Sequence, residues 1–165
     1  PSPSIASVLV SAGGSGEAAE AVSTICRHLS EKKPEWEIHA VLPDGHRIPA
    51  GVIRHSFGTG FPELLAQCEL FITAAGLSMY EAMYLGKPLI AFALVDHQHR
   101  NINHALASGS ILKVLDRIAD IEQFISMLAW FESPDKVSSM VRTNRQTIDG
   151  YGLKRVCNRL ADFFA

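Results

Sequence analysis

The glycine-rich segment at residues 11–16, SAGGSG, has the composition of a loop that could hold a phosphate. Its glycines would let the backbone approach a ligand closely, and a helix starting just after it would direct free N–H groups at an anion. The segment is neither a GxGxxG motif nor a P-loop, because the Gly-Lys-Ser/Thr sequence that holds a terminal phosphate is missing. It therefore predicts either a phosphate-binding loop or a tight strand-to-helix turn.

A second small-residue segment, residues 74–81 with the sequence AAGLSMYE, follows the same logic. Two interpretations of Glu81 are open. Ser78 and Glu81 have the spacing of a capping box, in which the carboxylate accepts a backbone N–H. If the helix instead begins near Ala75, Glu81 projects from its second turn, where its oxygens could accept both hydroxyls of a ribose. The residues alone favour the capping box.

A polar segment, DHQHRN at residues 96–101, directly follows the apolar run 88–95. Its amide and carboxylate groups could bind the hydroxyls of a sugar. The alternative is a solvated loop in which Asp96 caps the next helix. Similarly, GTGF at residues 58–61 predicts either a loop that holds a flat base or a turn with Phe61 in the core.

We expect neither a metal site nor a cofactor. His97, His99 and His104 are close in sequence, but no Cys or carboxylate set completes a recognisable ligand spacing. No Ser-His-Asp order or GxSxG elbow is present either, so the sequence identifies no catalytic residue.

The elements that position these loops alternate between apolar strands and amphipathic helices. This alternation predicts an α/β fold, a Rossmann-like parallel sheet with helices on both faces, in which ligands bind beyond the carboxyl ends of the strands. The last amphipathic stripe, after residue 150, is expected to pack in the core. The predicted strands are residues 5–10, 36–42, 52–55, 69–74, 89–95 and 111–115, and the predicted helices cover 18–29, 61–67, 79–85, 101–107 and three segments after 120.

Composition narrows the function classes. Lys and Arg total 15 and Asp and Glu total 17, giving a net charge of −2, so nucleic acid is not expected as the partner. No apolar run is long enough to cross a membrane, which leaves a peripheral association with a membrane open. Three cysteines, an odd number, favour reduced thiols and a cytoplasmic location. A length of 165 residues predicts a single domain.

These motifs, in this order, resemble the C-terminal, nucleotide-sugar-binding domain of GT-B-fold enzymes. SAGGS (11–15), CELFITAAGLSMYEA (68–82), LGKP (85–88) and DHQHRN (96–101) are similar to the peptidoglycan N-acetylglucosaminyltransferase. The tail DGYGLKRV (149–156) resembles the group containing the pseudaminic-acid-pathway UDP-sugar hydrolase and spore-coat polysaccharide proteins.

The resemblance implies a binding site for a UDP-sugar, with a diphosphate gripped by the loops around Gly14 and Gly76. The backbone at residues 57–58 would form hydrogen bonds with the edge of the uracil ring. Glu81 would accept hydrogen bonds from the ribose hydroxyls, which reverses the preference for the capping box. The implied substrate-binding residues are Gly13, Gly14, Ser15, Phe57, Gly58, Ala75, Gly76, Leu77, Ser78, Glu81, Asp96, Gln98 and Asn101.

The same resemblance predicts a glycosyltransferase of polysaccharide or glycoconjugate synthesis in which this chain supplies the donor half. The acceptor-binding N-terminal domain of such enzymes is absent here, so we expect it in a larger protein or a partner subunit, and we expect this domain alone to be inactive. The alternatives are a UDP-sugar hydrolase of a pseudaminic-type pathway, a UDP-GlcNAc epimerase and a non-catalytic partner subunit.

Overall fold

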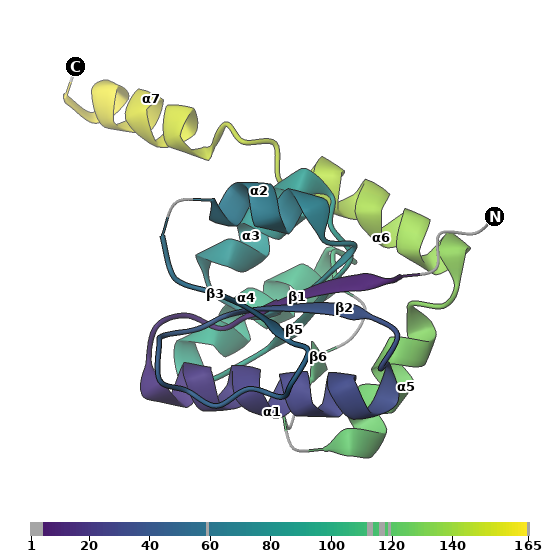
Figure 1. The fold of residues 1–165 in the computed structure, drawn as a ribbon. Helices are drawn as coiled ribbons and strands as arrows, with labels where there is room; N and C mark the ends of the chain where they lie inside the picture. The colour runs from purple at the N-terminus through teal and green to yellow at the C-terminus, as the bar shows by residue number, and fades with distance from the viewer. Residues whose placement is uncertain (1–4, 59, 112–113, 116–117, 119, 165) are drawn as a thin grey trace.

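The structure, a computed structural model, describes residues 5–58, 60–111, 114–115, 118 and 120–164. Strands and helices alternate through most of the chain (Figure 1). The strands are β1 (Ser7–Ser11), β2 (Glu37–Val41), β3 (Ile53–His55), β4 (Leu70–Ala74), β5 (Leu89–Phe92) and β6 (Val114–Leu115). The helices are α1 (Gly16–Lys32), α2 (Phe61–Gln67), α3 (Leu77–Leu85), α4 (Asp96–Ala107), α5 (Ile121–Trp130), α6 (Pro134–Thr147) and α7 (Gly152–Phe164).

One six-stranded sheet organises the domain, with the strand order β3-β2-β1-β4-β5-β6. Every pairing between neighbouring strands is parallel. The chain winds outward from β1 to β3 and then returns to add β4 on the other side of β1. The strand order therefore reverses beside β1, and the predicted parallel α/β fold is confirmed.

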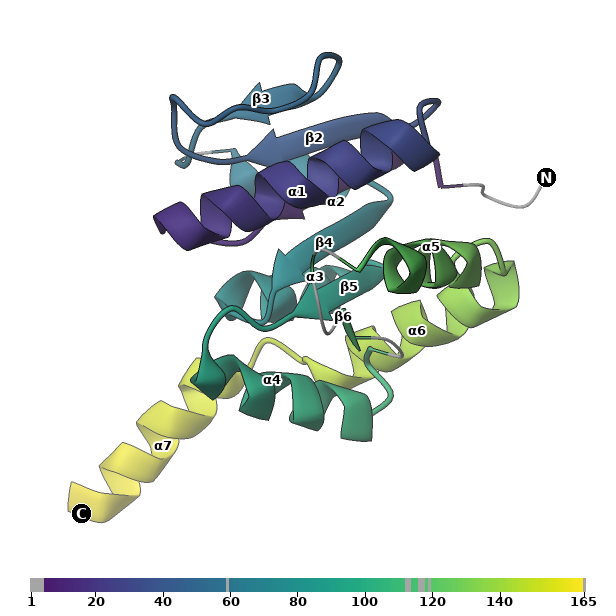
Figure 2. The same cartoon turned by 90° about the horizontal axis from the view of Figure 1, so that it is seen from below.

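Two hydrophobic clusters cover the two faces of the sheet. On one face, alternate strand residues such as Val8 and Val10 pack against α1 and α5; on the other, Leu9 and its neighbours pack against α2, α3 and α4. Figure 2 shows α1 and α5 lying along the same face. Because both faces are covered, the central strands read as continuous apolar runs rather than alternating ones. Residues 8–10 are fully buried.

One predicted boundary is wrong at the end of β5. The apolar run at residues 89–95 predicted one strand, followed by a polar loop up to Asn101. The strand ends instead at Phe92, and α4 already begins at Asp96. Val95, not Asp96, occupies the N-cap position, and Asp96 lies in the first helical turn. A carboxylate there stabilises the positive end of the helix dipole, which favours an early helix start. Of the predicted last strand, residues 112–113 lie outside the described residues.

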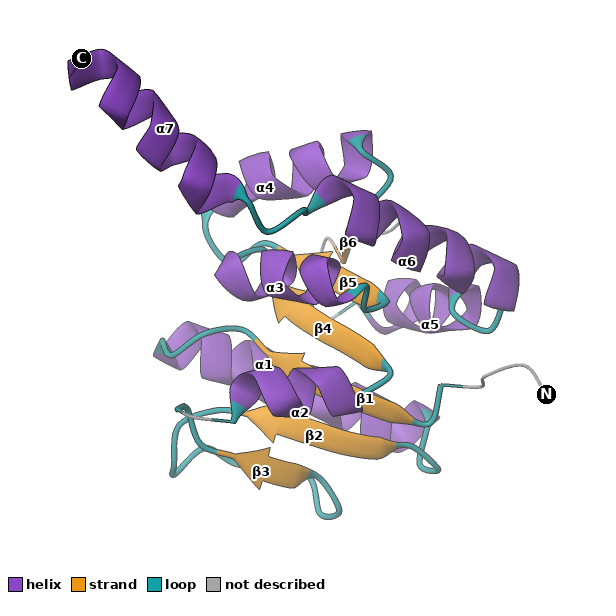
Figure 3. Ribbon diagram, turned by 90° about the horizontal axis from the view of Figure 1, so that it is seen from above, coloured by secondary structure: helices purple, strands orange, loops and turns teal. Residues whose placement is uncertain are grey.

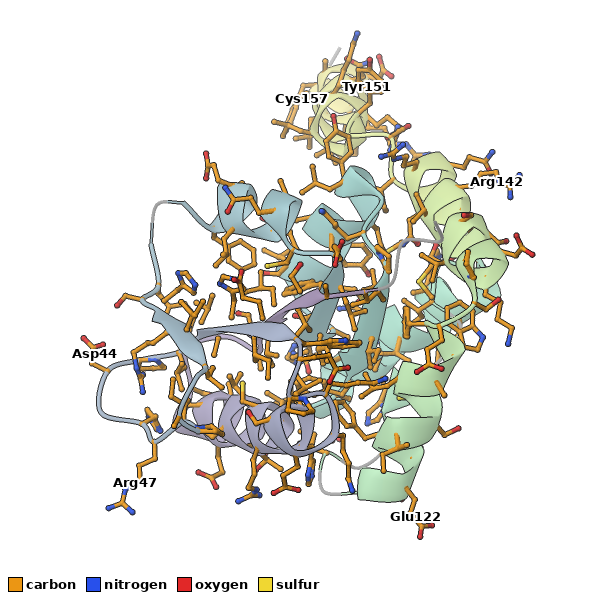
Figure 4. All side chains as sticks on the ribbon, turned by 45° about the vertical axis from the view of Figure 1, so that its right-hand side comes forward. Asp44, Arg47, Glu122, Arg142, Tyr151 and Cys157 are labelled. Carbon is orange, nitrogen blue, oxygen red and sulfur yellow. The ribbon has the colours of Figure 1, made fainter. Side chains whose placement is uncertain are left out.

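The prediction that the terminal stripe packs in the core is also wrong. Helix α7 has no buried residue, and it extends away from the body of the domain (Figure 1). Figure 4 shows Tyr151 and Cys157 on this projection. The exposed apolar side chains of α7 and the residue before it are Tyr151, Leu153, Val156, Leu160, Phe163 and Phe164. Amphipathic periodicity indicates that a helix has an apolar face, but it does not say what covers that face.

The connection into α7 is nevertheless ordered by local contacts. Asp149 accepts a hydrogen bond from the backbone N–H of Tyr151 at 3.0 Å, and both its oxygens bind the guanidinium of Arg155 at 2.7 and 3.1 Å. This hydrogen-bonded ion pair lowers the pKa of Asp149. At Gly150 a side chain would meet the ring of Tyr84 at 3.0 Å. The hydrogen bonds of Asp149 order the turn that leads into α7.

Candidate functional site

The carboxyl edge of the sheet gathers the predicted loops. Because every strand is parallel, the connections after β1, β4 and β5 all emerge at this edge. Helices α1, α3 and α4 begin there, with Ser15, Gly76 and Val95 at their N-cap positions. Figure 3 shows the strand arrows pointing to the side where α1, α2 and α3 begin. The N–H groups of each first helical turn have no partner within the helix, so this edge suits an anion.

The loop between β1 and α1 presents an open backbone. Gly13 has a φ of +100°, a left-handed conformation that favours glycine. No atom lies within 4 Å of where a side chain at Gly14 would begin. The Ser15 hydroxyl accepts a hydrogen bond from the N–H of Ala18 at 3.1 Å, so the side chain caps α1. Glu17, exposed in the first turn, carries a like charge that limits the anion affinity of this loop.

The loop between β4 and α3 excludes the capping-box interpretation of Glu81. Helix α3 begins at Leu77 with Gly76 as its N-cap, so Ser78 lies inside the helix and forms no capping box. The helix begins two residues later than the ribose interpretation assumed, and Glu81 is exposed on its second turn, so its contact with a ribose stays a prediction. Ala75, which precedes the helix, is anchored by a hydrogen bond from its N–H to the oxygen of Phe92 at 2.9 Å.

Two of the amides predicted to face a sugar also hold the backbone of the site. The oxygen of Gln98 accepts a hydrogen bond from the N–H of Leu94 at 2.8 Å and closes the connection between β5 and α4. The amide nitrogen of Asn101 donates to the oxygen of Ala75 at 2.8 Å. Asp96 is exposed beside them. The structure thus ties the β4–α3 loop to α4, and contact of these residues with a ligand stays a prediction.

A pocket of about 500 Å³ lies at the carboxyl ends of β2 and β3. Phe57, 45% exposed, and Gly58 are in its wall, where the resemblance places the base. Phe61 is half-buried: it packs edge-to-face on Phe71 with ring centroids 6.0 Å apart and also lines this pocket, so the structure does not separate the two interpretations of residues 58–61. The lining residues are Val41, Arg54, His55, Ser56, Phe57, Gly58, Gly60, Phe61 and Leu64.

Glu81 does not border this pocket. It lines a different, open pocket of about 550 Å³, together with Tyr80 and Tyr84 of α3. Helix α2 contributes Phe61 and Leu64 to the first pocket and other residues to the second. The structure therefore brings the glycine loops, α4 and the Phe57 pocket to one edge, whereas it places Glu81 on the outer side of α3.

Sequence analysis missed a chain of titratable residues beside the Phe57 pocket. Glu37 and His39 on β2 and His55 on β3 are connected by hydrogen bonds of 2.7 and 2.9 Å. These side chains come together only because β2 pairs with β3, with Val41 opposite His55. This register is not visible in the sequence. Within the described part of the chain, no group of His, Cys, Asp and Glu could hold a metal ion. Among those same residues, no helix is long and apolar enough to span a membrane.

Comparison with known proteins supports the fold. No protein-family model matches the chain. The spore coat polysaccharide biosynthesis protein SpsG of Bacillus subtilis (strain 168) is 28% identical over 103 residues, 61% of this chain and 30% of its own length. The match thus spans less than a third of that relative.

Solved structures match more of the chain. The spinosyn rhamnosyltransferase SpnG complexed with thymidine diphosphate has a TM-score of 0.71 at 21% identity, covering 88% of this chain and 42% of its own. MurG of Acinetobacter baumannii has a TM-score of 0.70 at 16% identity, covering 98% and 51%. The UDP-GlcNAc 2-epimerase of Neisseria meningitidis bound to UDP-GlcNAc has a TM-score of 0.70 at 17% identity, covering 94% and 44%. The chain therefore has the fold of a domain of GT-B enzymes, and the resemblance predicted from its motifs is confirmed at that level.

Proposed function

We propose that this chain binds a nucleoside diphosphate sugar, a UDP-sugar, as the donor half of a glycosyltransferase of polysaccharide or glycoconjugate synthesis. The observation that carries the proposal is the convergence of three helix N-termini, at Ser15, Gly76 and Val95, on the carboxyl edge of one parallel sheet. The Phe57 pocket opens at the ends of the neighbouring strands β2 and β3, where a base attached to the bound diphosphate could lie.

The chemistry of this edge fits a departing nucleotide diphosphate. The N–H of Gly76 donates to the oxygen of Ala74 at 2.7 Å. The N–H groups of residues 14, 77 and 78 would hold the phosphates and stabilise the charge that develops as the glycosidic bond breaks. The exposed carboxylate of Asp96 on α4 would accept a hydrogen bond from a hydroxyl of the sugar. The sequence comparison with SpsG, a protein of polysaccharide biosynthesis, supports the choice of pathway class. The matched proteins are much longer than this chain, so their remaining domains would supply the acceptor site.

Calorimetric titration of the chain with UDP, CDP, ADP and GDP tests the proposal. We expect saturable binding with a preference for UDP, and no turnover of UDP-sugars by this domain alone. Magnesium-free buffer with a chelator serves as a control, because the described residues hold no metal cluster. If none of the four nucleotides binds, the donor-site proposal is wrong for this chain.

The role of Glu81 needs its own variant. Losing charge-assisted hydrogen bonds to the ribose hydroxyls should weaken UDP binding in Glu81→Ala by about 1–3 kcal/mol. The deoxyribose of thymidine diphosphate lacks one hydroxyl, so Glu81→Ala should lose less affinity for thymidine diphosphate than for UDP. Glu63→Ala, an exposed carboxylate in the first turn of α2, is the matched control. Unchanged UDP affinity in Glu81→Ala would remove Glu81 from the site, as its place in the second pocket would then indicate.

The UDP-GlcNAc epimerase of Neisseria meningitidis favours a second candidate function on the same sheet. In that case UDP-GlcNAc bound at this edge would be isomerised rather than transferred. The two functions separate in the protein that carries this domain together with its remaining half. An epimerase interconverts free UDP-sugars without an acceptor, whereas a transferase releases UDP only as an acceptor is glycosylated.

A further inference from the structure

We infer that His55 recognises the nucleobase of the bound nucleotide as a hydrogen-bond acceptor, and that His39 and Glu37 set the proton position that makes it one. The inference rests on the proposed function and concerns its specificity. It starts from the position of His55 in the wall of the Phe57 pocket, next to Phe57 and Gly58.

The three side chains form a continuous hydrogen-bonded chain across two strands. The carboxylate of Glu37 lies 2.7 Å from Nε2 of His39, and Nδ1 of His39 lies 2.9 Å from Nε2 of His55. The two rings are stacked with centroids 5.1 Å apart and planes inclined by 29°. Both rings are half-buried, and Glu37 is exposed at the outer end.

This chain determines which nitrogens carry protons when both rings are neutral. An ionised carboxylate can only accept, so Nε2 of His39 must donate to Glu37. Nδ1 of His39 is then unprotonated and accepts from Nε2 of His55. It follows that Nδ1 of His55 is unprotonated. Within the described part of the chain, this nitrogen has no hydrogen-bond partner, so it is the one that remains for a ligand.

An acceptor at this position discriminates between pyrimidines. Uracil and thymine carry a hydrogen on ring nitrogen N3, which can donate to Nδ1 of His55. Cytosine has a lone pair at N3, so the same contact would oppose two acceptors and leave both unpaired. A site built to bind one hydrogen-bonding pattern rejects a ligand with the other more strongly than apolar contacts could.

Uptake of one proton reverses the pattern. With the added proton on His39, the ring that contacts the Glu37 carboxylate at 2.7 Å, both nitrogens of His39 donate. His55 accepts at Nε2 and carries its own hydrogen on Nδ1, which becomes a donor that suits cytosine. Burial, and then the neighbouring His39, lower the pKa of His55, which favours the neutral form of this ring.

Other charges near His55 do not compete for this proton. Arg54, on the same strand, directs its guanidinium to the oxygens of Pro43 and His46. The α2 residues that share the pocket, Phe61 and Leu64, are uncharged. Glu37 is therefore the charged group that contacts the histidine pair.

The test measures the ratio of UDP to CDP affinity by calorimetry between pH 7.5 and pH 5.5. The ratio cancels the titration of the diphosphate, which the two ligands share. We expect wild type to prefer UDP at the higher pH and to lose that preference as the pH falls. His55→Phe, which keeps an aromatic ring, should lower the ratio at pH 7.5 about tenfold, the effect of one lost hydrogen bond, and abolish its pH dependence. His104→Phe, an exposed position on α4, is the matched control.

A second variant tests the chain itself. In Glu37→Gln the amide oxygen can still accept from His39, so the preference for UDP at pH 7.5 should remain. Removing the negative charge disfavours the protonated pair and should move the pH midpoint of the ratio downward. If wild type binds UDP but His55→Phe, folded by circular dichroism, keeps the ratio and its pH dependence, the inference is overturned and the proposed function stands. If wild type binds no nucleotide, both are overturned.

Discussion

Asn101 donates its side-chain amide hydrogen to the backbone oxygen of Ala75 across 2.8 Å. The bond joins the second turn of α4 to the loop that starts α3, although the two residues are 26 positions apart. Both segments belong to the proposed diphosphate site. A single hydrogen bond therefore couples the geometry of two loops that emerge from different strands.

Replacing Asn101 by Ala should weaken this coupling. We expect a loss of about 1 kcal/mol in the free energy of unfolding, since the partly buried oxygen of Ala75 loses its partner. We also expect weaker UDP binding, because the N–H groups of residues 77 and 78 are no longer held in place. Asn103→Ala, exposed on the same helix, controls for helix propensity. Denaturant titration and calorimetry give the two quantities, and equal behaviour of the two variants would contradict the coupling.

The open backbone at Gly14 and Gly76 predicts variants that lose binding without losing stability. A side chain at either position would meet no atom within 4 Å, and neither residue has a positive φ. Gly14→Ala and Gly76→Ala should therefore keep the melting temperature while placing a methyl group where a phosphate would lie, which lowers UDP affinity. Gly152→Ala, equally open but on α7, is the control. Retained affinity in both site variants would argue against backbone contact with the diphosphate.

His28 predicts an acid-sensitive contact between α1 and α5. Its ring lies 6.0 Å from that of Phe124, and neither ring nitrogen has a partner within the described residues. Burial and then Arg27 lower its pKa from 6.5. The folded state thus binds fewer protons than the unfolded state, so stability is lost as the pH falls below about 6.5.

The variant His28→Phe should remove this dependence. Thermal melts at pH 7.5 and 5.5 should differ less in His28→Phe than in wild type, and the variant should be at least as stable at pH 7.5, since two unpaired nitrogens are removed. His104→Phe should retain the wild-type difference. An unchanged pH dependence in His28→Phe would assign the acid sensitivity to another group.

Helix α7 should contribute little to the stability of the domain. A chain truncated before Gly152 loses no buried residue, so its melting temperature should match that of the whole chain. The exposed apolar face should instead cause weak self-association. Sedimentation velocity at rising concentration should show association of the whole chain and much less for the truncated one. A monomer at every concentration in both would mean that this face does not drive association.

The sequence predicted the fold where local patterns and tertiary packing agree. Buried strands such as β1 and β4 are apolar throughout, and the glycines before α1 and α3 mark the turns. The prediction failed at Ser78, which has the spacing of a capping box but lies inside α3. Helix propensity does not determine the residue at which a helix begins. The prediction also failed at α7, because an apolar stripe does not identify its partner.

The candidate site was predictable only in part for a related reason. Small residues at strand ends are visible as short motifs, so the loops around Gly14 and Gly76 could be found. The Glu37–His39–His55 chain depends on the register between β2 and β3. The two histidines that this register brings together are 16 residues apart in the sequence. Such pairings carry no short-range signal.

The position of β1 at the centre of the sheet has a consequence for biosynthesis. Its partner β4 begins at Leu70, and the carboxylate of Glu69 accepts hydrogen bonds from the N–H groups of Ala6 and Ser7 at 2.6 and 3.1 Å. These contacts join residues more than 60 positions apart, so forming them costs much chain entropy. During translation one edge of β1 stays without its β4 partner until β4 has left the ribosome. Until then, the unpaired edge of β1 can pair with other strands.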